Sequence, residues 1–326
     1  MYFKKLLGIP KLLTSRLQYW RLNDYPLWRA RLECPIQYLA SWFARSEGGP
    51  TLEDVAVKVF CQVKDDSDIV EDWLRWHGYL FGFHNLVVIA DRPSPATVEV
   101  LDRYSGQVVI LQAPLGVWPS DLGWDDRRTC NINHAIKVYA NEADFVFPLD
   151  IDEFVIFEDK PSKRCILSEL KRLKRTHRDG FKFAREFQSC TLERPARPAL
   201  DIRTFRNAHA NFDLRKCFAS PQHLSWVGSG QCYVHTSDQL PPLVSRLSLL
   251  HFRWRGLDHM YQKCMDHVSQ EILLSDGTSR IPRVGGHVLQ GAQSIESGSF
   301  QAWARKEVGE ANKTIHSLAE HLSSLS

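Results

Sequence analysis

Four apolar runs of strand length alternate with segments of helical spacing in the first half of the chain. The runs cover residues 55–63, 86–90, 108–111 and 145–149. A repeated order of strand, helix and strand is typical of a parallel sheet with helices on its faces. Ligands bind such sheets outside the carboxyl ends of the strands. The sequence therefore predicts an α/β domain with a functional site at that edge.

The helices between these runs have recognisable limits. The first is predicted by apolar residues at helical spacing, namely Ile69, Trp73, Trp76 and Leu80. Asp68 and Glu71 predict a capping box at its start, and Gly82 marks its end. A short second helix closes at Gly106, and a third leads into the run that begins at residue 145. Pro148 is awkward within a central strand, so we expect strand pairing to stop there.

The second half has a more mixed pattern. We expect strands over residues 181–187, 215–219, 231–235 and 247–254, without regular helices between them. The chain turns helical after Gly256, and residues 303–322 predict one polar helix. We therefore expect three parts, which are an N-terminal extension (1–50), a catalytic domain (51–256) and a helical C-terminal extension (257–326).

Three carboxylates, those of Asp150, Asp152 and Glu153, lie between two apolar runs. Side chains two apart share a face of an extended chain, which puts Asp150 and Asp152 together. Two like charges at the edge of a core are costly unless a cation or hydrogen-bond donors compensate them. A divalent metal such as Mn²⁺ or Mg²⁺ would do so, because these ions prefer oxygen ligands. The alternative is an acidic strand end that faces water.

Composition limits the function classes. The chain has 326 residues, 44% of them hydrophobic, and a formal net charge of +3, which is too small to indicate nucleic-acid binding. Its eight cysteines are scattered without a C-x-x-C pair, which favours reduced thiols in a cytoplasmic protein. No apolar run approaches the roughly 18 residues of a membrane span, and the start of the chain does not resemble a signal peptide.

The net positive charge of the chain lies in its first 33 residues. They contain seven Lys and Arg residues against Asp24 and Glu33, interleaved with Leu and Trp. Such a segment can lie on an anionic membrane surface, which would place the protein at the inner face of the membrane. The alternative is a helix packed on the main domain with a solvated basic face.

The carboxylate segment also resembles a known group of enzymes. Residues 147–154, F-P-L-D-I-D-E-F, are similar to the hallmark of family 2-like and family 92-like glycosyltransferases, an apolar strand that runs into D-[IV]-D-E-F. Weaker similarities lie at residues 63–66, 71–77, 216–221 (followed by His235) and 250–252. Asp65 and Asp66 replace the Asn-Glu of the family, and residues 90–93 depart from its usual pattern, so the donor is not predicted.

The resemblance implies a GT-A fold, a nucleotide-sugar donor and a glycan or lipid-linked acceptor. It implies that Asp150 lies near the ribose or the metal, and that Asp152 binds a metal that bridges the two phosphates. His251 is a further candidate metal ligand. The other implied donor contacts are Asp65, Asp91, Arg128 and Lys216. Glu153 and Glu186 are candidate catalytic residues, with Glu186 as general base by its position on the strand after the motif.

Two other function classes compete with this interpretation. A metal-dependent phosphohydrolase also uses Asp-x-Asp after a strand, but the haloacid-dehalogenase type has the motif on its first strand, followed by Thr. The other class is a non-enzymatic protein that binds carbohydrate or nucleotide on the same fold. It would show no metal-dependent turnover.

Overall fold

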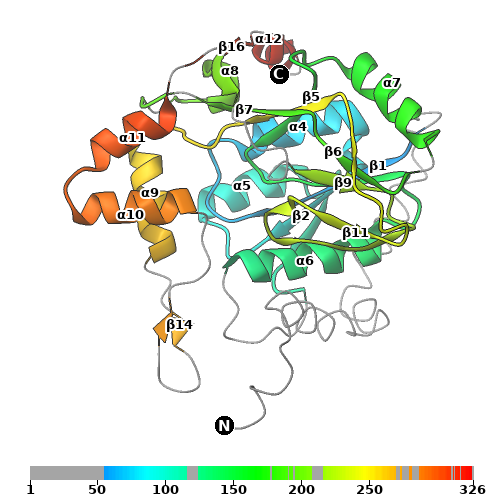
Figure 1. Ribbon diagram of the computed structural model, residues 1–326, viewed down its shortest axis with the longest axis horizontal. Helices are drawn as coiled ribbons and strands as arrows, with labels where there is room; N and C mark the ends of the chain where they lie inside the picture. The colour runs from blue at the N-terminus through cyan, green and yellow to red at the C-terminus, as the bar shows by residue number, and fades with distance from the viewer. Residues whose placement is uncertain are drawn as a thin grey trace.

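The computed structural model (Figure 1) describes residues 55–115, 124–176, 178–189, 191–193, 195–207, 216–268, 272–273, 279–280, 286–309, 311, 313–315 and 317–324. The predicted N-terminal extension therefore lies outside the described residues. Among the described helices, none combines the length and the apolar character that crossing a bilayer requires.

The larger sheet carries the four strands that the sequence predicts. Its order within the described residues is β12-β6-β9-β4-β1-β2-β3. Neighbours among the first four strands of the chain pair in parallel, whereas β9 runs antiparallel to β4 and β6. The bounds are β1 Val57–Val63, β2 Leu86–Ala90, β3 Val109–Gln112, β4 Phe145–Pro148, β6 Gly180–Lys182, β9 Cys217–Ala219 and β12 Leu243–Val244. The expectation of a mostly parallel central sheet is confirmed, and β4 ends at Pro148 as predicted.

Helices cover both faces of this sheet, as Figure 1 shows. Helices α4 (Val70–Phe81) and α5 (Pro95–Tyr104) pack on one face, and α6 (Trp124–Tyr139) packs on the other. Successive side chains of β1 point to opposite faces of the sheet, so Val59 packs in the core beneath α4 whereas Phe60 packs in the core beneath α6. The middle of β1, Val59, Phe60 and Cys61, is continuously apolar, as expected for a strand that is buried on both faces.

A second sheet completes the mixed half. Within the described residues its order is β16-β8-β7-β13-β5, and β13 pairs antiparallel with β5 and parallel with β7. The bounds are β5 Glu153–Phe157, β7 Arg185–Ser189, β8 Thr204–Asn207, β13 Leu247–His251 and β16 Lys313–Thr314. The chain passes from the first sheet to the second between β4 and β5. The Asp150–Glu153 segment therefore lies at the junction of the two sheets.

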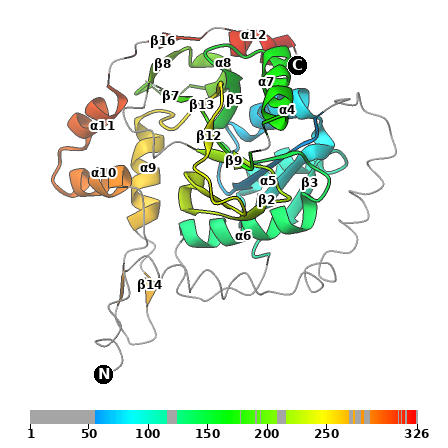
Figure 2. The same ribbon diagram turned by 45° about the vertical axis from the view of Figure 1, so that its right-hand side comes forward.

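Helices at the end of the chain form a lobe beside the second sheet, which Figure 2 shows from the side. Helices α9 (Leu257–Val268) and α11 (Phe300–Val308) enclose a small core of Trp254, Met260, Ala304 and Val308, and α10 (Gly286–Glu296) packs on α9. The remaining elements are η1 Phe83–Asn85, α7 Lys163–Lys174, α8 Pro198–Asp201, β10 Leu224–Val227, η3 Ser229–Gln231, β11 Val234–Thr236, β14 Ile272–Leu273, β15 Ser279–Arg280 and α12 Ser317–Ser324.

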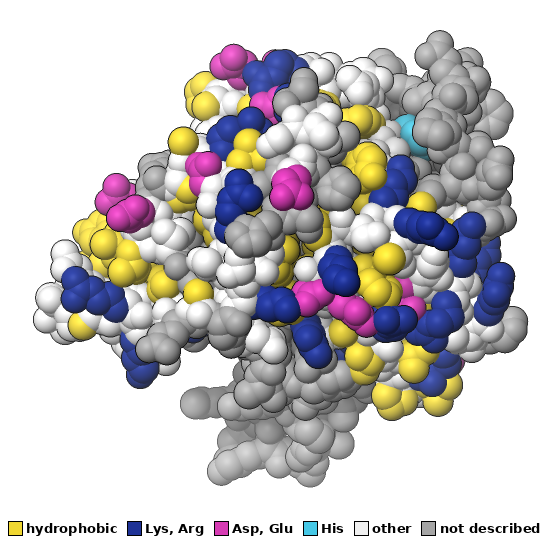
Figure 3. Space-filling view, turned by 90° about the horizontal axis from the view of Figure 1, so that it is seen from above, with side chains coloured by type: hydrophobic (Ala, Val, Ile, Leu, Met, Phe, Trp, Pro, Cys, Tyr) yellow, Lys and Arg dark blue, Asp and Glu magenta, His cyan; other side chains and the backbone are white. Residues whose placement is uncertain are grey.

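Helix α7 is the predicted surface helix rich in Lys and Arg. Its apolar residues Ile166, Leu170 and Leu173 are buried, whereas Arg164 and Lys171 are exposed. Figure 3 shows the molecule from above, with basic side chains spread over the upper face of the protein and acidic side chains between them. The helix is therefore an ordinary amphipathic one with a solvated outer face.

Three local expectations are wrong. Residues 181–187 form two strands, β6 and β7, which belong to different sheets. Residues 303–322 are not one helix, because β16 separates α11 from α12 and pairs with β8. The capping box is absent from α4, whose N-cap is Ile69 without a side-chain hydrogen bond. Asp68 instead accepts a hydrogen bond from Arg255 Nε at 2.9 Å.

His77 ties α4 to β5 and predicts a loss of stability in acid. Its buried ring donates from Nδ1 to the Trp73 carbonyl at 3.0 Å, and Nε2 accepts from Val155 N–H at 3.4 Å. Burial lowers the pKa of His77 from 6.5 to about 3. Below pH 6.5 the His77 ring therefore binds a proton in the unfolded chain but not in the folded chain, so the free energy of unfolding decreases as pH falls from 6.5 toward 3. At pH 5 this costs about 2 kcal/mol.

Urea unfolding of His77→Gln between pH 7 and pH 5 tests this prediction. We expect the variant to lose less stability across this interval than the wild type, whatever its stability at pH 7. His223→Gln is the matched control, because His223 is exposed. If both variants keep the wild-type slope, His77 is not the titrating group.

Candidate active site

The segment from Asp150 to Glu153 forms a turn between the two sheets. The buried Glu153 side chain accepts a hydrogen bond from Asp150 N–H at 2.9 Å, which closes the turn. The Asp152 carbonyl accepts from Phe252 N–H at 2.8 Å, which fixes the turn to the end of β13. These two hydrogen bonds thus fix the backbone that carries the Asp150 and Asp152 carboxylates.

Asp150 is bound by two basic side chains from the first sheet's side. Arg128 on α6 donates to Asp150 Oδ1 at 2.6 Å, and Lys216, which precedes β9, donates to Asp150 Oδ2 at 2.8 Å. Burial would raise the pKa of Asp150, but the charges of Arg128 and Lys216 outweigh it and lower this pKa. Asp150 is therefore ionised at neutral pH. The structure brings these three residues together, and their contact with a nucleotide-sugar remains a prediction.

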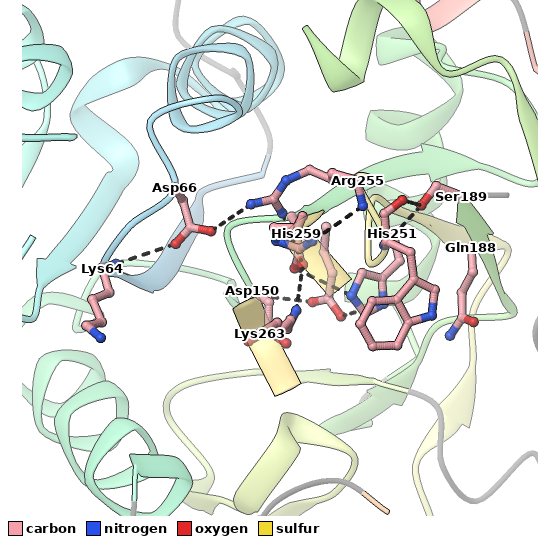
Figure 4. A network of polar contacts seen from close by, with 12 residues as sticks. Lys64, Asp66, Asp150, Gln188, Ser189, His251, Arg255, His259 and Lys263 are labelled. Carbon is pink, nitrogen blue, oxygen red and sulfur yellow. Dashed lines mark hydrogen bonds and ion pairs between the residues drawn. The ribbon is translucent and has the colours of Figure 1, made fainter. Parts of the chain in front are cut away.

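Asp152 faces three cations from the second sheet's side. Its Oδ1 atom is 3.5 Å from His251 Nε2, and its Oδ2 atom is 3.5 Å from Lys263 Nζ and 3.7 Å from Arg255 Nη1. Burial opposes ionisation, but His251, Lys263 and Arg255 together hold the pKa of Asp152 well below its ordinary value. Figure 4 shows His251, Lys263 and Arg255 converging on the turn that carries Asp150. Basic side chains thus compensate the negative charges of Asp150 and Asp152, a role that the sequence analysis assigned to a metal.

His251 is oriented by Glu186. Glu186 Oε1 lies 2.7 Å from His251 Nδ1 and also accepts from Gln188 Nε2 at 2.9 Å. Burial disfavours the imidazolium, but the carboxylates of Asp152 and Glu186 raise the pKa of His251 to about 10. Glu186 therefore orients the His251 ring, with Nε2 on the Asp152 side. Its role as general base remains a prediction.

Glu153 has a supporting position rather than an exposed one. The side chain is fully buried, and its Oε1 atom lies 3.3 Å from Lys216 Nζ without a hydrogen-bond partner among the described residues. Burial raises the pKa of Glu153 to about 7. Because Glu153 closes the turn and lies against Lys216, it helps to position Asp150 and Lys216, and its role as a catalytic residue remains a prediction.

Arg255, like Lys263, is a member of the site that sequence reasoning missed. Although it is only 1% exposed, it donates to Asp68 Oδ2 at 2.9 Å and to Asp66 Oδ1 at 3.1 Å, besides facing Asp152. Figure 4 shows the Asp66 contact. Arg255 therefore links the loop after β1 to the carboxylate turn. The acidic residues Asp66 and Asp68 indicated a need for a nearby cation, but no local sequence pattern identifies the distant Arg255 as that cation.

Asp65 and Asp91 lie at the neighbouring strand ends, outside this cluster. Asp65 follows β1 and is half exposed, with its Oδ2 atom 3.6 Å from Lys64 Nζ. Asp91 follows β2 and is buried, and its carboxylate accepts from Gln62 Nε2 and from Arg92 Nε, both at 3.1 Å. The expectation that both carboxylates end strands of the first half is confirmed. Their contact with a nucleotide remains a prediction.

His235 lies elsewhere. Its ring stacks on Trp226 with centroids 4.4 Å apart and 10° between the planes. The histidine that follows the similarity at residues 216–221 thus lies in the β10–β11 hairpin and not among the carboxylates.

Asp152 and His251 fit a divalent cation as a pair. The described residues contain no group of three or more His, Cys, Asp or Glu side chains arranged to hold a metal. However, Asp152 Oδ1 and His251 Nε2 are 3.5 Å apart, and a carboxylate orients the other ring nitrogen, as is usual for metal-binding histidines. A metal at Nε2 would displace the proton that His251 carries here. Asp150 is paired with Arg128 and Lys216, and its role as a metal ligand remains a prediction.

Comparisons with known proteins find only distant likeness. No family model and no curated protein matches the chain. Solved structures that are similar to it include residues 1–349 of TarS of S. aureus, with a TM-score of 0.37 and 11% identity over 65% of this chain and 65% of that one. The match therefore spans less than two thirds of that chain. Glucosyl-3-phosphoglycerate synthase from Mycobacterium tuberculosis has a TM-score of 0.40 and 14% identity, over 73% of this chain and 94% of that one. The mannosyltransferase PcManGT from Pyrobaculum calidifontis has a TM-score of 0.34 and 11% identity, over 92% and 78%.

Proposed function

We propose that the protein is a GT-A type glycosyltransferase of the family 2-like and family 92-like group, which moves a sugar from a nucleotide-sugar donor to a glycan or lipid-linked acceptor. The observation that carries the proposal is the cluster of buried or largely buried basic side chains around two ionised carboxylates. This cluster lies at the end of β4, in the sheet in which β1 to β4 run parallel to one another. In such sheets ligands bind at this edge.

The chemistry of the cluster suits a diphosphate leaving group. As the bond between the sugar and the diphosphate breaks, negative charge accumulates on the diphosphate oxygens. Lys216 and Arg128 present positive charge on one side of the carboxylate turn, and Arg255 presents it on the other. These side chains are already held by Asp150 and Asp152, so little reorganisation is needed when the charge develops.

Asp152 and His251 would hold Mn²⁺ or Mg²⁺, with remaining positions left for phosphate oxygens. Such an ion would supply further positive charge to the leaving diphosphate. Glu186 would then keep the His251 ring in the orientation that ligation requires. Asp65 and Asp91, at the ends of β1 and β2, would contact the base and ribose.

Release of a nucleoside diphosphate tests the function. The protein is incubated with a panel of nucleotide-sugars, with Mn²⁺ or Mg²⁺ and with a mixture of glycan acceptors, and the nucleoside diphosphate is measured. We expect turnover with one class of donor and its loss on chelation. Binding of nucleotide without turnover would favour the non-enzymatic class. Release of inorganic phosphate from simple phosphate esters would favour the phosphohydrolase.

Asp91→Ala is expected to weaken nucleoside diphosphate binding more than it lowers stability. Asp91 holds Gln62 and Arg92 at the end of β2, where a nucleotide would lie. The loss of one charge-assisted hydrogen bond would weaken binding by about tenfold. Titration calorimetry measures it, and Asp102→Ala, an exposed change on α5, is the control. Unchanged affinity in Asp91→Ala would remove Asp91 from the site.

We also propose that residues 1–33 dock on an anionic membrane, as their surplus of basic residues suggests. Each basic residue near such a surface contributes about 1 kcal/mol, and salt screens it. The full chain is therefore expected to sediment with anionic liposomes at low salt, and a chain without residues 1–33 is expected to stay in the supernatant. Equal recovery of both in the pellet would contradict this.

A further inference from the structure

An aromatic cluster of Trp226, Tyr233 and His235 lies on one face of the β10–β11 hairpin. Antiparallel pairing puts Trp226 opposite His235, and Tyr233, two positions before His235, shares their face. The Trp226 and His235 rings are stacked, with centroids 4.4 Å apart. The Tyr233 ring stands edge-on to both, with its centroid 5.4 Å from that of Trp226 and 5.8 Å from that of His235. The three rings therefore form one compact unit.

The other face of the hairpin packs on the core that β4 shares with α6. Val227 is buried there, and Val234 is partly buried against the same core. Because side chains alternate between the two faces of a strand, the aromatic cluster lies on the face that points away from this core. Tyr233 is accordingly 44% exposed. The cluster thus presents an aromatic ring at the surface of the protein.

The backbone of Gly228 holds the Tyr233 ring in place. A Cβ atom on Gly228 would lie only 2.0 Å from this ring, so the ring rests directly on the glycine backbone. Gly228 N–H also donates a hydrogen bond to the Tyr233 carbonyl at 2.9 Å. With Trp226 and His235 against its other contacts, the ring is positioned before any ligand arrives. Such preorganisation lowers the entropic cost of binding.

Gln231 connects the aromatic cluster to the carboxylate turn. This residue of η3 is buried, and its Oε1 atom accepts a hydrogen bond from Lys216 Nζ. The same ammonium group donates to Asp150 Oδ2 at 2.8 Å. Tyr233 follows Gln231 by two residues, so their Cα atoms lie within about 7 Å of each other. The aromatic cluster is therefore next to the candidate active site.

The aromatic cluster lies across β4 from the strand ends proposed for the nucleotide. Lys216 immediately precedes β9, and the strand order in this part of the sheet is β9-β4-β1-β2. Asp65 and Asp91 follow β1 and β2. Three strand spacings, about 14 Å, separate β9 from β2. A ligand on the aromatic cluster and a nucleotide at β1 and β2 can therefore be bound at the same time.

We propose that Trp226, Tyr233 and His235 bind a sugar ring of the acceptor. This inference rests on the proposed glycosyl transfer, because it assigns the aromatic cluster to the acceptor side. A pyranose ring carries C–H bonds on its faces, and these hydrogens are attracted to the negative face of an aromatic ring. A glycan held by one ring on the cluster can extend its next ring toward the carboxylate turn, where a hydroxyl group would receive the transferred sugar.

Saturation-transfer NMR with the full chain tests the sugar site. The probes are the methyl pyranosides of glucose, galactose, mannose and N-acetylglucosamine, and disaccharides of the same sugars. We expect one class of sugar to bind, with the strongest transfer to the C–H protons of one ring face. Tyr233→Ala should weaken this binding about tenfold, and Tyr233→Phe should retain most of it. Tyr261→Ala on α9 is the matched control, because Tyr261 is 43% exposed, and it should bind as the wild type does.

Gly228→Ala tests the placement of the Tyr233 ring separately from its chemistry. The added Cβ atom forces the ring to move, although no aromatic group is lost. We expect sugar binding to weaken as it does in Tyr233→Ala. Gly106→Ala is the control, because a Cβ atom there would meet no described atom within 4 Å. Thermal melting of each variant establishes that it is folded.

The outcomes separate this proposal from the proposed function. Equal binding by wild type and Tyr233→Ala, or no binding of any sugar in the panel, would overturn the sugar site. An equal loss of nucleoside diphosphate affinity in Tyr233→Ala would place the donor base on the aromatic cluster, and would overturn its assignment to the acceptor. If the wild type binds no nucleoside diphosphate, the proposed function fails. The sugar site would then still stand or fall by the comparison of wild type with Tyr233→Ala.

Discussion

Asp152→Asn is expected to lower the turnover of a nucleotide-sugar by roughly 10²-fold or more. The substitution removes the negative charge between His251, Lys263 and Arg255, and with it the carboxylate of the proposed metal pair. The side chain keeps its size, so the loss reports on charge. Turnover is measured as nucleoside diphosphate released at saturating metal. Asp102→Asn on the exposed face of α5 is the matched control.

The same variant should also be less stable than the wild type. The pKa of Asp152 is held well below its ordinary value because His251, Lys263 and Arg255 favour the charged form in spite of burial. The stabilisation by the carboxylate is thus present at neutral pH and is lost when the charge is removed. The attraction of these three cations outweighs the repulsion between the Asp150 and Asp152 carboxylates. Full activity in Asp152→Asn, or a wild type that chelators leave unaffected, would contradict the metal proposal.

Arg255→Met should lower the free energy of unfolding by about 3–5 kcal/mol. Removing one partner of a buried ion pair leaves the others uncompensated, and here Asp66, Asp68 and Asp152 would all lose a cation. Urea unfolding at pH 7 measures the loss. Arg255→Lys should recover only part of it, because an ammonium group cannot donate to Asp66 and Asp68 in the fixed geometry of a guanidinium.

Arg246→Met is the control for this effect. Arg246 also pairs with a carboxylate, that of Glu158, but both side chains are about half exposed. Exposed pairs contribute about 0–1 kcal/mol, so this variant should lose little stability. Similar losses in Arg246→Met and Arg255→Met would show that burial of Arg255 is not what makes its contacts important.

The sequence was sufficient for the first half of the fold and for the centre of the site. Alternation of apolar runs with helical spacing located β1 to β4 and their helices, since β1, β2 and β4 are buried on both faces. The pairing of Asp150 with Asp152 indicated a charged site at a strand end. Arg128, Lys216 and His251 followed from the family resemblance, and the structure places all three against this turn.

Long-range contacts account for what the sequence did not show. Arg255 binds Asp68 and Asp66 from 187 and 189 positions away, and this contact is why Asp68 does not cap α4. The segment 181–187 carries three buried phenylalanines, Phe181, Phe183 and Phe187, yet the chain leaves one sheet and joins the other within it. Local periodicity describes which faces are buried, but it does not say which sheet buries them.

The pairing of β5 has a consequence for how the protein is made. This strand begins with Glu153 and pairs with β13, whose first residue, Leu247, is synthesised about ninety positions later. While the chain is leaving the ribosome, β1 to β4 can assemble, but the apolar β5 has no strand to pair with until β13 has been synthesised. Such edges promote association between nascent chains. The carboxylate turn is therefore completed late in synthesis, and slow translation between β5 and β13 should increase aggregation of this protein.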